Sequence, residues 1–134
     1  QYEQIGENMD IVSIVEQLSK VAKLKKVSND EYEIVTDAKI DSRTPIKIFL
    51  RKTENGVVMC DKKNTLKFMN NIYELKSLDV KGCIAAVIRI YGFTIASGEL
   101  ISNDITPKNV LETFYNFIIC VGQLANMYAF FDKP

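Results

Sequence analysis

Residues 106–131 read TPKNVLETFYNFIICVGQLANMYAFF and have the periodicity of one long helix. Thr106 is a good N-cap, because its hydroxyl can accept a backbone N–H one turn later, and Pro107 suits the first helical position. Apolar residues then recur at the three-four spacing of a single helix face, at Val110, Leu111, Phe114, Phe117, Ile118, Val121, Leu124, Ala125, Tyr128 and Phe131. A helix of this length spans roughly 37 Å. We therefore expect it to be the spine on which a sheet packs.

The opposite face of this predicted helix is only partly polar. It carries Glu112, Asn116, Gln123 and Asn126, together with Tyr115 and Ile119. A sheet covers one face of a helix, so the second face needs a further cover, either other helices or another copy of the protein. We predict that this face binds a second copy of the chain or a protein partner, through Tyr115, Asn116, Ile119, Gln123 and Asn126.

A membrane-spanning helix is the alternative reading of the same residues. No formal charge lies between Glu112 and Asp132, and the window is long enough to cross a bilayer. However, Asn116, Gln123 and Asn126 lie inside it and are unfavourable in hydrocarbon, and no basic cluster flanks it. We therefore favour a buried helix and no membrane contact.

The composition indicates one globular domain over residues 1–134. Its 47% hydrophobic content is too high for a disordered chain. Seventeen basic and seventeen acidic residues give zero net charge, so there is no overall attraction to nucleic acid or anionic lipid. The start, Gln1 to Gln4, is polar and not a signal peptide; the missing Met suggests a trimmed or processed start. Three scattered cysteines, at positions 60, 83 and 120, indicate buried thiols in a reducing, cytoplasmic setting.

The chain contains no histidine. This absence excludes Ser-His and Cys-His nucleophile systems, zinc sites of the HExxH type and a histidine pH switch. No glycine-rich phosphate loop is present either, so we predict no cofactor, no metal and no catalytic residue.

The remaining pattern predicts an α+β fold. A first helix is expected over Asp10 to about Lys26, then an antiparallel meander of three strands over about residues 31–61, with a type I′ turn at Asn55-Gly56. A short helix from Thr65 to about Leu75 and another capped by Asp79 and ended by Gly92 follow. A second tight hairpin around Ser97-Gly98 precedes the long C-terminal helix, so we expect three or four helices against the strands.

Two other functional readings start from the charged residues. A basic strand face with nearby aromatics would suit nucleic acid, and its candidates are Lys47, Arg51, Lys52, Lys62, Lys63 and Lys67. Asp61 with Glu74 and Lys76 could instead hold Mg²⁺ in a metal-dependent nuclease, because hard oxygen ligands suit that ion. Because the net charge is zero, we favour an ordinary charged strand face over the nucleic-acid site. The nuclease site is disfavoured because Glu-x-Lys is a common tripeptide and, on a helix, residues two apart do not share a face.

The second half of the chain resembles a family of small bacterial and phage proteins, the domain of unknown function 1828. The shared features are a helix ending in Tyr91-Gly92, the hairpin Gly98-Glu99-Leu100 and a long terminal helix; at Lys62-Lys63-Asn64 the chain departs from the family's Asp-Gly. The resemblance covers about residues 45–125 and implies a bacterial or phage cytosolic origin. The element order is also similar to that of type III secretion chaperones. Together these observations predict a non-enzymatic binding or regulatory domain that acts through protein–protein contacts of its helices.

Overall fold

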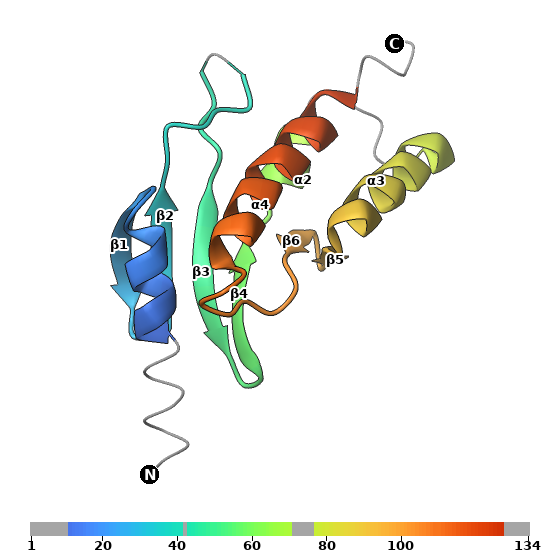
Figure 1. The fold of residues 1–134 in the computed structure, drawn as a ribbon. Coiled ribbons are helices and arrows are strands. Elements are labelled where there is room, and N and C mark those ends of the chain that lie inside the picture. Colours follow the sequence, from blue (N-terminus) through green and yellow to red (C-terminus); the bar gives the residue numbers. More distant parts are fainter. Residues whose placement is uncertain (1–10, 42, 71–76, 128–134) are drawn as a thin grey trace.

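A computed structural model describes residues 11–41, 43–70 and 77–127. The fold is α+β, as the sequence predicts, with one antiparallel sheet of six strands in the order β1-β2-β3-β4-β6-β5 (Figure 1). The strands are β1 Lys23–Ser28, β2 Glu31–Val35, β3 Ile48–Thr53, β4 Gly56–Cys60, β5 Thr94–Ala96 and β6 Glu99–Ile101. The predicted three-stranded meander is therefore β2–β3–β4, and the predicted second hairpin is β5–β6.

The first helix is shorter than the sequence predicts. Residues 11–18 are helical, but residues 23–28 form β1. The predicted helix is longer because the apolar spacing of Leu18, Val21 and Ala22 continues the helical pattern. The pairing of residues 23–28 with β2 is what makes this segment a strand. In that pairing Leu24 lies opposite Ile34, and Lys25 lies opposite Glu33. Lys23, Lys25 and Lys26, at the end of the predicted helix, thus belong to an edge strand, where charge discourages pairing with a further strand.

The two hairpin turns differ from each other in backbone geometry. The β3–β4 hairpin is present, but its loop is Glu54-Asn55, and Asn55 does not have a positive φ. The predicted type I′ turn at Asn55-Gly56 is therefore wrong; the hydroxyl of Thr53 stabilises the loop by accepting the N–H of Asn55 and donating to the carbonyl of Gly56. Two consecutive positive φ values, 53° and 79°, occur instead at Ser97-Gly98 in the β5–β6 hairpin, and these suit a type I′ turn.

Within the described residues, three further helices follow the meander: α2 Asn64–Met69, α3 Leu78–Tyr91 and α4 Val110–Ala125. Gly92 ends α3 in the left-handed conformation, as predicted, but Ser77 rather than Asp79 occupies the N-cap position. Helix α2 ends at Met69 and α4 at Ala125, each earlier than predicted. The remainder of the two predicted spans, towards Leu75 and Phe131, lies outside the described residues.

The C-terminal helix begins later than predicted. Asn109 is the residue before α4, and Thr106 with Pro107 forms part of the preceding turn. Thr106 and Asn109 are linked reciprocally, because the N–H of Thr106 donates to Asn109 Oδ1 at 2.8 Å and the N–H of Asn109 donates to Thr106 Oγ1 at 3.2 Å. These two hydrogen bonds pair the backbone N–H groups and side-chain oxygens of Thr106 and Asn109 within the turn. The helix therefore begins after this turn, at Val110.

The core lies between one face of the sheet and the helices. Figure 1 shows residues 11–18 in front of β1 and β2, and α4 in front of β3 and β4. Phe114, Phe117 and Leu124 of α4 are fully or almost fully buried, as are Leu50 and Met59 of the sheet. Helices α2 and α3 pack against α4. The C-terminal helix is therefore the central packing element of the fold.

Candidate protein-binding face

The predicted partner-binding residues all lie on the outward side of α4. Tyr115 and Ile119 are each 49% exposed, Gln123 and Asn126 are exposed, and Asn116 is half-buried. Their spacing of three and four residues places them in one row along the helix. Large apolar side chains half-exposed in such a row are the observation that makes this face a candidate site.

A groove runs beside this row, between α3 and α4. The groove is lined by Val87 of α3, by Ile119, Gly122 and Gln123 of α4, and by Asn126 and Met127, which follow α4. Its volume is about 520 Å³. Gly122 contributes to the hollow because nothing lies within 4 Å of the place where a side chain would begin. Tyr91 Oη donates to Gln123 Oε1 at 2.9 Å and so joins the two helices at this groove.

The same surface carries no formal charge on α4 beyond its first turn. The residues from Thr113 to Asn126 contain no Asp, Glu, Lys or Arg. Hydrogen-bonding capacity comes from neutral groups, namely the Tyr115 hydroxyl and the amides of Asn116, Gln123 and Asn126. Burying this face therefore requires no desolvation of an ion.

The predicted basic residues do not form a continuous positive face. Arg51 Nη1 and Nη2 each lie 2.9 Å from an oxygen of Glu99, and Arg51 Nε lies 3.5 Å from Glu31 Oε1. Lys62 pairs with the same Glu31 and lies 4.3 Å above the centre of the Phe49 ring. Arg51 and Lys62 are thus brought together, but two glutamates that the sequence reading did not include neutralise them.

The other four predicted basic residues are dispersed. Lys52 follows Arg51 on β3 and therefore faces the opposite side of the sheet. Lys47 is exposed just before β3, Lys63 precedes α2, and Lys67 lies in its last turn. The nucleic-acid reading stays a prediction, without a shared positive surface to support it.

The Arg51–Glu99 pair determines the electrostatics of this part of the sheet. Hydrogen bonds from the guanidinium hold the pKa of Glu99 below its ordinary value, and they raise the pKa of Arg51. Cys60 lies on the adjacent strand, and burial raises the pKa of its thiol to about 12. A thiol with this pKa stays protonated near neutral pH and is a poor nucleophile.

Asp61, the strand-end residue of the nuclease hypothesis, has a structural role. It is 1% exposed, and its Oδ1 accepts the N–H groups of Lys63 and Leu100 while its Oδ2 accepts the N–H of Thr65. The carboxylate thus joins the end of β4 to the start of α2 and to β6. Glu74 and Lys76 lie outside the described residues, and within the described ones no group of three or more acidic, cysteine or histidine side chains could hold a metal ion.

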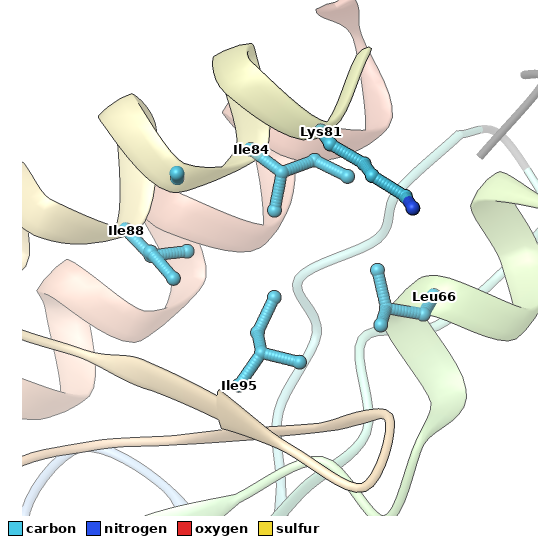
Figure 2. Close-up of a pocket in the computed structure, with 6 residues that line it drawn as sticks. Leu66, Lys81, Ile84, Ile88 and Ile95 are labelled. Atoms are coloured by element: carbon cyan, nitrogen blue, oxygen red, sulfur yellow. The ribbon is translucent and has the colours of Figure 1, made fainter. Parts of the chain in front are cut away.

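A separate apolar pocket lies between α2, α3 and β5. Leu66, Lys81, Ile84, Ala85, Ile88 and Ile95 line it, and its volume is about 300 Å³. Figure 2 shows the side chains of Leu66, Ile84, Ile88 and Ile95 converging on one space, with the Lys81 ammonium at its edge. The sequence did not predict this pocket, because its residues come from three separate elements. Within its own helix or strand, each of them has only the spacing of an ordinary core residue.

Comparison with known protein families, curated proteins and solved structures finds no significant match to this chain. The resemblance to the domain of unknown function 1828 and the similarity to type III secretion chaperones therefore stay predictions. In the described part of the chain, none of the helices combines the length and the apolar character that crossing a bilayer requires.

Proposed function

We propose that this chain is a non-enzymatic binding domain that pairs with a second copy of itself through the outward face of α4. The observation that carries the proposal is the exposure of Tyr115 and Ile119, each 49%, beside the groove between α3 and α4. Covering the exposed part of one such side chain contributes about 1 kcal/mol, from roughly 25 cal/mol per Å² of apolar surface. Several such contributions are needed before association outweighs its entropic cost.

The lack of charge on this face supports a second copy as the occupant. In a two-fold dimer each residue meets the same patch of the other subunit, so any charge near the axis faces its own duplicate. From Thr113 to Asn126 no charge exists to cause such repulsion. A partner recognised by charge would have nothing to pair with here.

A specific arrangement follows if the two α4 helices pair antiparallel with the axis at Ile119. Tyr115 and Gln123 are each four residues from Ile119, so Tyr115 of one copy then lies opposite Gln123 of the other. Gln123 lines the groove. The aromatic ring thus enters the groove of the second copy, in the manner of the large aromatic anchors common at interfaces.

The first experiment places a charge at the centre of this face. Ile119→Asp should produce a monomer in sedimentation equilibrium, because an aspartate at the axis faces an aspartate in an apolar contact. Val12→Asp is the matched control: Val12 is 54% exposed on the first helix and belongs neither to α4 nor to the groove lining. Circular dichroism verifies that both variants are folded. An Ile119→Asp protein with the same mass as the Val12→Asp protein would contradict the proposal.

The second experiment tests the pairing itself. Tyr115→Lys should weaken association, and adding Gln123→Glu to the same chain should restore it, because each lysine then faces a glutamate of the other copy. Glutamate retains the oxygen that accepts the Tyr91 hydroxyl, so the link between α3 and α4 can persist. A double variant that dissociates as readily as Tyr115→Lys would reject the axis at Ile119.

A further inference from the structure

We propose that the pocket between α2, α3 and β5 binds a small amphipathic carboxylate, with its hydrocarbon part inside and its carboxylate at Lys81. The pocket is independent of the proposed dimer face. Ile84 and Ile88 of α3 line this pocket, whereas Val87 of the same helix lines the groove beside α4. Two different sides of α3 therefore face two different hollows.

The lining of the pocket selects an apolar ligand body. The lining offers only branched aliphatic side chains and one methyl group, from Leu66, Ile84, Ile88, Ile95 and Ala85. Figure 2 shows these groups approaching from two helices and a strand, so the hollow is enclosed on more than one side. No side chain in this set can hydrogen-bond to a polar ligand body, which therefore loses hydration without compensation.

The size of the pocket limits the ligand to one short chain or ring. Its volume of about 300 Å³ lies at the lower end of the usual range for small-molecule sites, roughly 300–1,000 Å³. A single medium-length alkyl chain or an aromatic ring fits such a space. The two acyl chains of a phospholipid do not.

The charge at the edge selects the head group. Lys81 is the one charged residue of the six, and its side chain is exposed. Within the described ranges no carboxylate forms an ion pair with Lys81. An ammonium beside an apolar hollow is complementary to a molecule that is apolar at one end and anionic at the other. Because the ammonium lies at the open edge, the carboxylate stays partly in water and avoids most of the desolvation penalty.

Calorimetric titration with three ten-carbon ligands tests this assignment. Decanoate should bind more tightly than decanol, and decylamine should bind most weakly, because Lys81 attracts the first and repels the last. Equal affinity for decanoate and decylamine, or no heat of binding with decanoate, would overturn the proposal.

Two variants locate the binding and one serves as a control. Lys81→Met should lower decanoate affinity by about tenfold, the effect of losing one charge-assisted contact, while leaving decanol affinity unchanged. Ala85→Leu should lower the affinity for both decanoate and decanol, because the larger side chain fills the pocket. Arg89→Met removes another exposed cation from α3, outside this pocket, and should change neither affinity. Decanoate affinity that is unaffected by Lys81→Met and Ala85→Leu would place the ligand elsewhere and reject the site.

The dimer proposal and the pocket proposal fail separately. Ile119 lies outside the pocket lining. Ile119→Asp should therefore leave decanoate binding unchanged even where it abolishes association. Loss of decanoate binding in that variant would contradict the independence of the two sites.

Discussion

Arg51 on β3 and Glu99 on β6 form an ion pair across the intervening strand β4. Arg51 Nη1 lies 2.9 Å from Glu99 Oε1, and Arg51 Nη2 lies 2.9 Å from Glu99 Oε2. Val58 is the residue of β4 opposite Arg51, and it is only 8% exposed. The ion pair therefore spans a strand and helps to shield an apolar side chain on the sheet face away from α4. Of the six predicted basic residues, Arg51 and Lys62 are thus paired with the carboxylates of Glu99 and Glu31.

Loss of this pair should lower stability in a pH-dependent way. Glu99→Gln should reduce the free energy of unfolding by about 1 kcal/mol at neutral pH, a modest value because the Arg51 side chain is one-third exposed. The folded pKa of Glu99 lies below its ordinary value of 4.5, so the stabilisation is present above that value and is lost as the pH falls through the folded pKa. Urea unfolding of both proteins at neutral and acidic pH measures this. A stability difference that grows on acidification would contradict the assignment.

Asp61 should be among the most sensitive polar positions of the described chain. Asp61→Ala leaves the N–H groups of Lys63, Thr65 and Leu100 without their acceptor, and we expect a loss of roughly 3 kcal/mol or more. Asp61→Asn should be less damaging, because one oxygen remains. Asp30→Ala, in the exposed β1–β2 turn, should change stability by less than about 0.5 kcal/mol.

The structural role of Asp61 also predicts the response to metal. Addition of Mg²⁺ should leave the melting temperature unchanged, because the carboxylate oxygens are occupied by backbone donors. A rise in melting temperature with Mg²⁺ that disappears in Asp61→Asn would instead support the nuclease reading.

Two glycines of the α3 region should respond oppositely to alanine. Gly92 has a φ of 72° at the C-cap of α3, so Gly92→Ala should destabilise the fold by about 1 kcal/mol through backbone strain. Gly82 lies within α3 with nothing within 4 Å of an added methyl group, so Gly82→Ala should stabilise it by about 0.5–1 kcal/mol. Thermal unfolding of the two variants checks both signs, and two changes of the same sign would contradict the account.

The three thiols should differ in reactivity. Burial raises the pKa of Cys60 and of Cys120 to about 12, so both stay protonated and inaccessible in the folded protein. Cys83 on α3 is only half-buried. Titration with an aromatic disulfide reagent should modify one thiol per folded chain quickly and all three after denaturant is added. Rapid modification of all three thiols in the folded state would show that the core around Cys60 and Cys120 opens readily.

Local sequence signals predicted the fold class well, and long-range contacts explain where they failed. The Gly92 helix end, the β3–β4 hairpin and the apolar spacing of α4 follow from residues a few positions apart. Strand β1 was missed because the evidence for it is pairing with β2, which a helical spacing of apolar residues does not reveal.

The polar sites were harder to predict than the elements. Asp61 and Leu100 are 39 residues apart in the chain, and Arg51 and Glu99 are 48 residues apart. Which carboxylate accepts which donor depends on the strand order β4-β6, in which β5 and β6 return to the sheet after two helices. The outward row on α4 was easier to predict, because it needs only the helical period.

Sedimentation equilibrium of the unmodified chain over a wide range of micromolar concentrations tests the central proposal most directly. If α4 pairs two copies, the mass rises with concentration from 15.2 kDa towards twice that value. A mass that stays at 15.2 kDa at every concentration would contradict it.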